Sequence, residues 1–171
     1  MSESRITLQK VEGYIGGREN LRKSLQEDFV GHWMIREADL EACTYRHLRR
    51  FLEPDKRWRI FARAYSKRLG RYPDLTILEG RKPRLAIELK WRRKRISRKD
   101  RCALNDFLKL PHAKKAYFIT TVITKHDYRK LGSDKTKSEK IRLKEIPLIL
   151  DLPQMRLAKW EQVRSSYRQA L

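Results

Sequence analysis

The sequence predicts a mixed α/β fold, in which helices flank one central sheet of parallel and antiparallel strands. The first observation is a long amphipathic helix at residues 36–53, where apolar residues recur every three or four positions until Pro54 ends the pattern. The second is a change to a period of two over residues 58–91, which open with the segment WRIFARAY. The third is a return to helical spacing at 97–110, followed by a strand-like segment at 116–123. Helices around one mixed sheet accommodate this order better than a helix bundle or a β-sandwich does.

The expected elements follow from these periods and from the Gly and Pro residues between them. The three central strands are short and joined by tight turns, so they predict an antiparallel β-meander. Residues 125–144 carry eight Lys or Arg, three acids and few apolar residues, and we expect a mobile or loosely helical basic insertion there. In chain order, the predicted elements are a short helix at 18–30, the helix at 36–53, strands at 58–65, 73–80 and 84–91, the helix at 97–110, strands at 116–123 and 146–152, and a closing helix at 153–171.

The length and the apolar content favour one domain. A chain of 171 residues with 40% hydrophobic residues can fill one sizeable core. Four Trp, seven Tyr and five Phe argue against a disordered basic chain, since such chains are poor in large apolar side chains. We expect residues 35–152 to form the core of a single domain, with 1–34 as a helical N-terminal extension and 153–171 as a C-terminal helix.

The chain is strongly basic. Lys and Arg number 42 against 21 Asp and Glu, which gives a formal net charge of +21 at pH 7. Clustered Lys and Arg bind polyanions by releasing condensed counterions, so nucleic acid, and DNA above all, is the expected partner. No apolar run reaches the roughly 18 to 20 residues that span a bilayer, and the first residues lack the apolar stretch of a secretory signal. We therefore expect no membrane partner and an intracellular location, cytoplasmic or nucleoid-associated.

Two neighbouring strands hold polar residues that the strand pattern does not explain. Asp74 follows Pro73 at the start of the second strand, and the third strand contains Glu88 and Lys90, which alternation places on one face. If the two strands form a hairpin, Asp74 and Glu88 approach each other across it. Close carboxylates are the ligand type that Mg²⁺ prefers. The Lys90 ammonium on the same face can steady an attacking water or the developing phosphate charge.

The spacing of Pro73-Asp74 and Glu88-x-Lys90 resembles the PD-(D/E)XK motif of the restriction-endonuclease-like nucleases. The resemblance implies an αβββαβ core over about residues 35–122. It also implies a deoxyribonuclease that depends on Mg²⁺, for which Mn²⁺ can substitute. In such an enzyme Asp74, Glu88 and Lys90 are the catalytic residues, and Asp74 and Glu88 are metal ligands.

In this superfamily a Glu on the helix before the strands often completes the metal site. The helix at 36–53 offers Glu37 and Glu41. The resemblance favours Glu37, because its Glu-x-Asp-Leu start is similar to that of several such nucleases, and it leaves Glu41, one turn further, as the alternative ligand. Acids in the first turns of a helix are also favoured by the helix dipole, so their presence alone does not indicate a metal site.

Basic residues cluster directly after the third strand and around the end of the first long helix. A solvated face rarely needs so many charges of one sign, and Arg suits bidentate contacts with phosphate. The predicted DNA-contacting residues are Arg49, Arg50, Arg57, Arg92, Arg93, Lys94, Arg95, Arg98, Lys99, Arg101 and Lys109.

Two other functions stay open at this point. One is a catalytically silent nucleic-acid-binding module of the same fold within a larger DNA-processing complex. The other is a basic RNA-associated protein without a metal site. For the nuclease, an endonuclease is favoured over an exonuclease. The structure of the substrate, its sequence specificity, and the choice between a homodimer and a partner protein also stay open.

Overall fold

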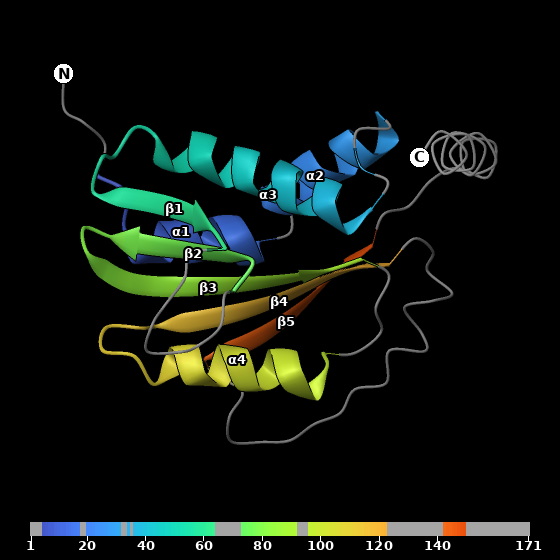
Figure 1. The fold of residues 1–171 in the computed structure, drawn as a ribbon. Coiled ribbons are helices and arrows are strands. Elements are labelled where there is room, and N and C mark those ends of the chain that lie inside the picture. Colours follow the sequence, from blue (N-terminus) through green and yellow to red (C-terminus); the bar gives the residue numbers. More distant parts are fainter. Residues whose placement is uncertain are drawn as a thin grey trace.

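The computed structural model has a mixed α/β architecture, with one five-stranded sheet between helices on both faces, as predicted (Figure 1). It describes residues 5–17, 20–31, 34, 36–63, 73–91, 96–122 and 142–149. The elements are α1 (Leu8–Gly16), α2 (Leu21–Val30), α3 (Glu37–Leu52), β1 (Trp58–Ala62), β2 (Leu75–Glu79), β3 (Lys82–Lys90), α4 (Arg98–Leu108), β4 (Lys115–Val122) and β5 (Leu143–Ile149).

The sheet order is β1-β2-β3-β4-β5, so each strand pairs with the one that precedes it in the chain. The pairs β1–β2 and β2–β3 are antiparallel, which confirms the predicted meander. The pair β3–β4 is parallel because α4 carries the chain back before β4 begins, and β4–β5 is parallel as well. In the hairpin between β2 and β3, Gly80 takes a φ of +62°, a region that Gly adopts without steric cost.

Strand β1 is shorter than the strand predicted at 58–65. It ends at Ala62, because the next residue, Arg63, has a φ of +45° and leaves the extended conformation. A positive φ at a residue other than Gly cannot be foreseen from alternation of apolar side chains.

Strand β5 begins earlier than the strand predicted at 146–152. Its start overlaps the predicted basic insertion, because Lys144 and Glu145 are exposed in a strand at the sheet edge and show no apolar alternation. The greater part of that insertion, residues 125–141, and the predicted helix at 153–171 lie outside the described residues.

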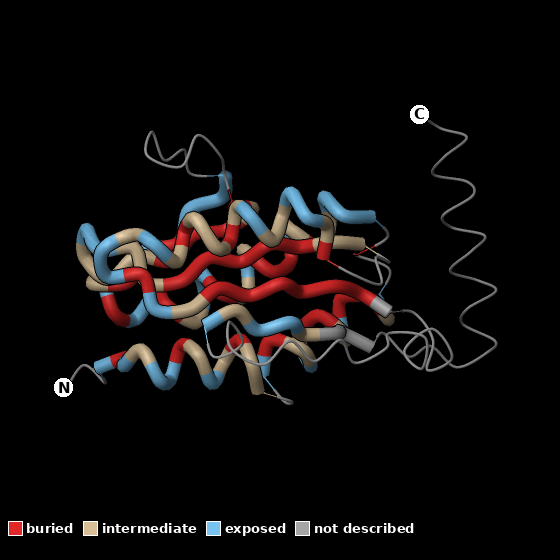
Figure 2. The backbone as a smooth tube through the Cα atoms, turned by 90° about the horizontal axis from the view of Figure 1, so that it is seen from below, coloured by how far each residue is buried: buried red, intermediate tan, exposed pale blue. Residues whose placement is uncertain are grey.

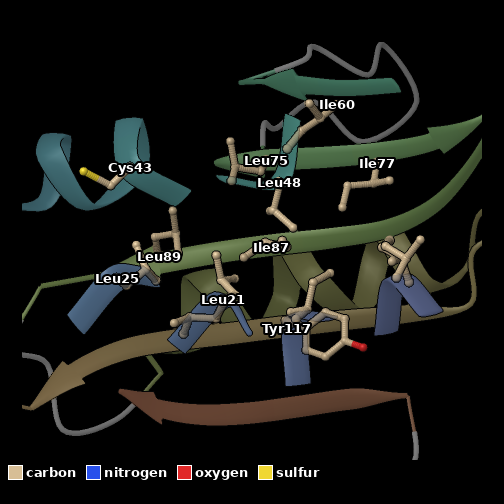
Figure 3. Close-up of a cluster of buried hydrophobic side chains, with 14 of the residues drawn as sticks. Leu21, Leu25, Cys43, Leu48, Ile60, Leu75, Ile77, Ile87, Leu89 and Tyr117 are labelled. Atoms are coloured by element: carbon tan, nitrogen blue, oxygen red, sulfur yellow. The ribbon is translucent and has the colours of Figure 1, made fainter. Parts of the chain in front are cut away.

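Helices α1, α2 and α3 cover one face of the sheet and share a core with it (Figure 3). Leu21 and Leu25 of α2 and Leu48 of α3 are fully buried beside Ile77 and Ile87 of the central strands. Burying one such aliphatic side chain stabilises a fold by about 1.5–3 kcal/mol. The three helices are therefore held to the sheet by the hydrophobic effect.

Helix α1 has no counterpart among the predicted elements. Its nine residues include two glycines, which weaken the helical signal. Thr7 caps the helix by accepting a hydrogen bond from the Lys10 backbone nitrogen at 3.3 Å, and Val11 and Ile15 are buried. The region expected as an N-terminal extension, 1–34, thus supplies part of the core.

Helix α4 covers the opposite face of the sheet. Its Leu104 and Phe107 pack on Ala86 of β3 and on Ala116 and Phe118 of β4. With helices on both faces, β3 is buried along most of its length (Figure 2). A charged residue in this strand therefore needs partners inside the protein.

Asp55 joins the N-terminal segment to the turn before β1. Its carboxylate accepts hydrogen bonds from the Ile6 backbone nitrogen at 2.9 Å and from Arg57 Nε at 2.9 Å. The Trp58 indole nitrogen donates to the Ile6 carbonyl at 2.9 Å, which completes the link. The hydrogen bond from Arg57 outweighs the effect of burial and holds the pKa of Asp55 well below its usual value.

We expect Asp55→Asn to lower the melting temperature at neutral pH by several degrees. The amide is neutral and has one acceptor oxygen, so it cannot replace the carboxylate in all of these hydrogen bonds. A depressed pKa contributes stability above the unfolded-state value near 3.8, and this contribution is lost as the pH falls below it. The difference between the two proteins should therefore shrink toward pH 3 in thermal unfolding followed by circular dichroism. Equal melting temperatures at pH 7 would contradict this role.

Candidate active site

One end of the sheet brings together the residues of the predicted catalytic constellation. The register places Ala62, the last residue of β1, opposite Leu75, the first of β2, and Leu75 opposite Ile87 of β3. Asp74 comes directly before β2, and α3 begins with Glu37 at this same end (Figure 1). Four elements therefore meet where β3 ends.

The ammonium of Lys90 lies among three carboxylates from three different parts of the chain. Lys90 Nζ donates to Glu88 Oε1 at 2.6 Å. It is 3.7 Å from Asp74 Oδ2 and 3.6 Å from Glu37 Oε1. The pleat of β3 puts Glu88 and Lys90 on one face, the hairpin brings Asp74 across, and α3 supplies Glu37.

The backbone around Lys90 holds two of these carboxylates in place. The Leu89 nitrogen donates to Asp74 Oδ2 at 2.7 Å, and the Trp91 nitrogen donates to Glu37 Oε2 at 3.1 Å. Because Leu89 and Trp91 are the chain neighbours of Lys90, the positions of Asp74 and Glu37 are tied to that of Lys90. The backbone therefore fixes two of the three carboxylates around Lys90.

Burial changes the acidity of the site. The Glu88 residue is only 6% exposed, and this desolvation, with the negative charge of Asp74, raises its pKa to about 7 against the opposing effect of Lys90. Burial also raises the pKa of Asp74, although the Leu89 bond and Lys90 oppose it. Burial alone would lower the pKa of Lys90, but its bond to Glu88 and the nearby carboxylates raise it. Lys90 is therefore protonated at neutral pH.

The raised pKa of Glu88 predicts a pH-dependent stability of the metal-free protein. The folded state binds the proton more tightly than the unfolded state, whose pKa is near 4.5, so the Glu88 contribution to stability decreases as the pH rises from 4.5 through about 7. Glu88→Gln imitates the protonated form. In EDTA it should gain up to about 3 kcal/mol over wild type above pH 7, and the gain should vanish toward pH 4.5.

Urea unfolding of both proteins between pH 4.5 and 8.5 measures this difference. The matched control is Glu27→Gln, at an exposed position of α2, where no such trend is expected. A difference between Glu88→Gln and wild type that stays constant across this range would show that the burial of Glu88 is not responsible.

The donor set fits a divalent cation. Asp74, Glu88 and Glu37 present hard carboxylate oxygens of the kind that Mg²⁺ and Mn²⁺ take, and two of these groups are desolvated, so a nearby positive charge stabilises their ionised forms. In the described part of the chain, no group of three or more His, Cys, Asp or Glu side chains is arranged closely enough to hold a metal as it stands. The Lys90 ammonium occupies the point on which the carboxylates converge.

Glu41, the alternative ligand from the helix, has a different partner. Its Oε2 accepts a hydrogen bond from an Arg63 terminal nitrogen at 2.8 Å, and the two form an ion pair. Glu37 approaches Lys90 instead. Both glutamates lie in the first two turns of the same helix, but only Glu37 joins the carboxylates around the ammonium.

The predicted DNA-contacting residues fall into separate regions. Arg98, Lys99 and Arg101 lie in the first turns of α4, which starts shortly after β3 ends, and Arg101 also pairs with Glu145 at 3.2 Å. Lys109 follows the far end of the helix and pairs with Asp106 at 2.9 Å. The run Arg92, Arg93, Lys94 and Arg95 lies outside the described residues.

The second predicted basic cluster is distant from the carboxylates. Arg49 and Arg50 are in the last turn of α3, and Arg49 is 12 positions from Glu37, or about 18 Å along the helix at 1.5 Å per residue. Arg57 is engaged with Asp55 and lies 3.8 Å from Glu79. Among the predicted DNA-contacting residues that the structure describes, Arg98, Lys99 and Arg101 lie at the end of the sheet where β3 ends (Figure 1).

Two residues near the site, Arg63 and Asp100, were not predicted as site residues from the sequence. Arg63 follows the end of β1 and pairs with Glu41, as described above. Asp100, in the first turn of α4, is close enough to Glu88 for its charge to raise the pKa of Glu88. Its Oδ2 accepts a hydrogen bond from the Ser97 hydroxyl at 2.7 Å. The Ser97-x-x-Asp100 pattern is typical of a helix start, so its sequence signal indicates a cap rather than a site.

No family model matches the chain, and no curated protein has a significantly similar sequence. None of the described helices is both long enough and apolar enough to cross a membrane.

Proposed function

We propose that this protein is a metal-dependent nuclease that hydrolyses DNA phosphodiester bonds through a PD-(D/E)XK site. The observation that carries the proposal is the convergence of Glu37, Asp74 and Glu88 on the Lys90 ammonium within 3.7 Å. Three carboxylates from separate elements around one partly buried lysine are costly to the fold. Such a cost is reasonable where the groups have a chemical task.

The topology around the site supports a restriction-endonuclease-like core. Elements α3, β1, β2, β3, α4 and β4 follow one another in the order αβββαβ. The motif lies at the start of the second of these strands and in the third, and the helix glutamate begins the first helix. This arrangement agrees with the one that the motif resemblance implies.

Asp74, Glu88 and Glu37 are the residues that would hold Mg²⁺ or Mn²⁺. When bound, the ion supplies Lewis-acid polarisation of the scissile phosphate and lowers the pKa of a water molecule. The Leu89 and Trp91 backbone nitrogens hold Asp74 and Glu37 in orientation. A bound cation would have to displace the Lys90 ammonium from the carboxylate oxygens that it now contacts.

Lys90 acts as a fixed positive charge in this proposal. Its raised pKa keeps the ammonium protonated at neutral pH, which makes it a poor general base. It can donate a hydrogen bond to the attacking water and neutralise part of the charge that develops on the phosphate. Once a cation shares the carboxylates, the ammonium no longer has to balance all of them.

The charge of the protein supports DNA as the substrate. The net charge is +21, and Arg98, Lys99 and Arg101 begin the helix that follows the catalytic strand. Cationic groups beside the site attract the phosphate backbone without reading its sequence. Several such groups at one end of the sheet would hold a phosphate backbone close to the carboxylates.

The experiment that tests the function is cleavage of labelled duplex, single-stranded, flapped and four-way DNAs with Mg²⁺, Mn²⁺ or EDTA. We expect cleavage products only when a divalent cation is present, and mainly from one of these DNA structures. Salt-sensitive binding to DNA without products under any of these conditions would overturn the nuclease.

The second candidate is a silent nucleic-acid-binding module of the same fold in a larger DNA-processing complex. It is favoured by one observation, that Lys90 fills the centre of the carboxylates and can balance them without a metal. Calorimetry with Mn²⁺ separates the two functions. The nuclease requires a binding site that is lost in Glu88→Ala, whereas the silent module requires none.

A further inference from the structure

Arg63 lies beside the carboxylate site in a backbone conformation that is unfavourable for its residue type. Its φ is +45°, in the left-handed region where Gly is preferred. Its backbone nitrogen donates to the Asp74 carbonyl at 2.8 Å, so this conformation is tied to the proposed catalytic aspartate. A residue held in an unfavourable conformation next to a site suggests a role for its side chain.

Among the described residues, Glu41 anchors the Arg63 guanidinium by one hydrogen bond, and the side chain is largely exposed. One terminal nitrogen donates to Glu41 Oε2 at 2.8 Å, while the Arg63 side chain is 69% exposed. The charges of Asp74 and Glu37 act on the same guanidinium and, after Glu41, help to raise its pKa. The group is thus a permanent cation at the edge of the site, and Glu41 engages only one of its several N–H donors.

We propose that Arg63 contacts a phosphate of the DNA strand bound at the carboxylate site and that Glu41 positions its guanidinium. The inference rests on the proposed function in that it takes DNA as the ligand. A planar guanidinium matches two phosphate oxygens, and an anchor on one nitrogen reduces the rotamer freedom lost when the contact forms.

This inference gives the two glutamates of α3 different tasks. Glu37 faces Lys90 and the Trp91 nitrogen, where a metal ligand is needed. Glu41, one turn further along, holds Arg63. Glu41 is then a positioning residue and not the alternative metal ligand.

The test compares Arg63→Ala with Arg63→Gly by fluorescence anisotropy with labelled DNA in EDTA over a range of salt concentrations. Both variants should bind DNA about tenfold more weakly, and the slope of log K against log salt should fall by roughly 0.9, the value for one lost phosphate contact. The control is Arg5→Ala, which removes the same charge at an exposed position beside Ile6, at the opposite end of β1, and should leave the slope unchanged.

Thermal unfolding of the same two variants separates DNA contact from structure. Gly tolerates the positive φ, so Arg63→Gly should melt at a higher temperature than Arg63→Ala, while the two share the same DNA affinity. DNA affinity that follows the melting temperature would mean that Arg63 acts through the fold, and this would overturn the phosphate contact.

The role of Glu41 is tested by rescue. The amide oxygen of Glu41→Gln can still accept the Arg63 hydrogen bond, so this variant should keep the wild-type salt slope and the wild-type Mn²⁺ affinity. Glu41→Ala cannot accept this bond, and it should lose most of the part of the salt slope that comes from Arg63. If Glu41→Gln loses Mn²⁺ binding, Glu41 is a ligand and its positioning role is overturned.

Failure of this inference is distinct from failure of the nuclease. Wild-type cleavage together with unchanged binding in both Arg63 variants would remove the contact and leave the nuclease standing. Weakened binding in these variants of a protein that makes no cuts would support the contact and remove the nuclease. A wild-type protein that binds no DNA would overturn both.

Discussion

Asp74→Asn should reduce metal-dependent DNA cleavage by at least about 10³-fold while DNA binding in EDTA stays within about twofold of wild type. The substitution removes the negative charge that a divalent cation needs. It keeps an oxygen that can accept the Leu89 hydrogen bond, so the hairpin geometry is preserved. The chemistry should therefore be lost without loss of the fold. Single-turnover cleavage and anisotropy on the same DNA measure the two effects.

A charge-matched control for this variant is Asp106→Asn. Asp106 lies in α4 and pairs with Lys109, away from the carboxylates. Cleavage by this control should equal that of wild type. Near-normal cleavage by purified Asp74→Asn would exclude Asp74 from the metal site and with it the proposed mechanism.

Lys90→Ala should abolish cleavage, by about 10²- to 10⁴-fold, and yet strengthen Mn²⁺ binding. The ammonium now balances Glu88, Asp74 and Glu37, so it competes with a divalent cation for the same oxygens. Its removal leaves three mutually repelling carboxylates, two of them largely buried. The metal-free variant should therefore be less stable than wild type, and Mn²⁺ should raise its melting temperature by more.

Differential scanning fluorimetry with and without Mn²⁺, beside calorimetric titration, measures these opposite effects. Lys23→Ala, at an exposed position of α2, is the matched control and should resemble wild type in all three respects. Retained cleavage would remove Lys90 from the mechanism. Weaker Mn²⁺ binding in Lys90→Ala would mean that the ammonium assists the metal site and does not compete with it.

Much of the site could be predicted because it depends on short-range geometry. The pleat alone places Glu88 and Lys90 on one face of β3, and a tight hairpin of β2 and β3 brings Asp74 opposite them. Apolar periodicity likewise predicted α3 and the meander, since both bury a regular face. These predicted features are present in the structure because no contact between distant segments competes with them.

Features that depend on packing between distant segments were not predictable in this way. Helix α1 has a weak local signal, and its place comes from Val11 and Ile15 in the shared core. The end of β1 at Ala62 depends on the left-handed backbone of Arg63, which is held by the Asp74 carbonyl. Neither feature leaves a periodic pattern in the chain.

By itself, the sequence determined the mixed α/β class, the strongly basic character, and the approach of Asp74, Glu88 and Lys90 along one hairpin. Only the tertiary structure decided that Glu37 meets Lys90 while Glu41 meets Arg63. The physical reason is that both glutamates lie in the first two turns of the same helix and have similar local preferences. Their partners depend on how α3 lies across the ends of β1 and β3, which is set by the hydrophobic core that the helices and the sheet bury together.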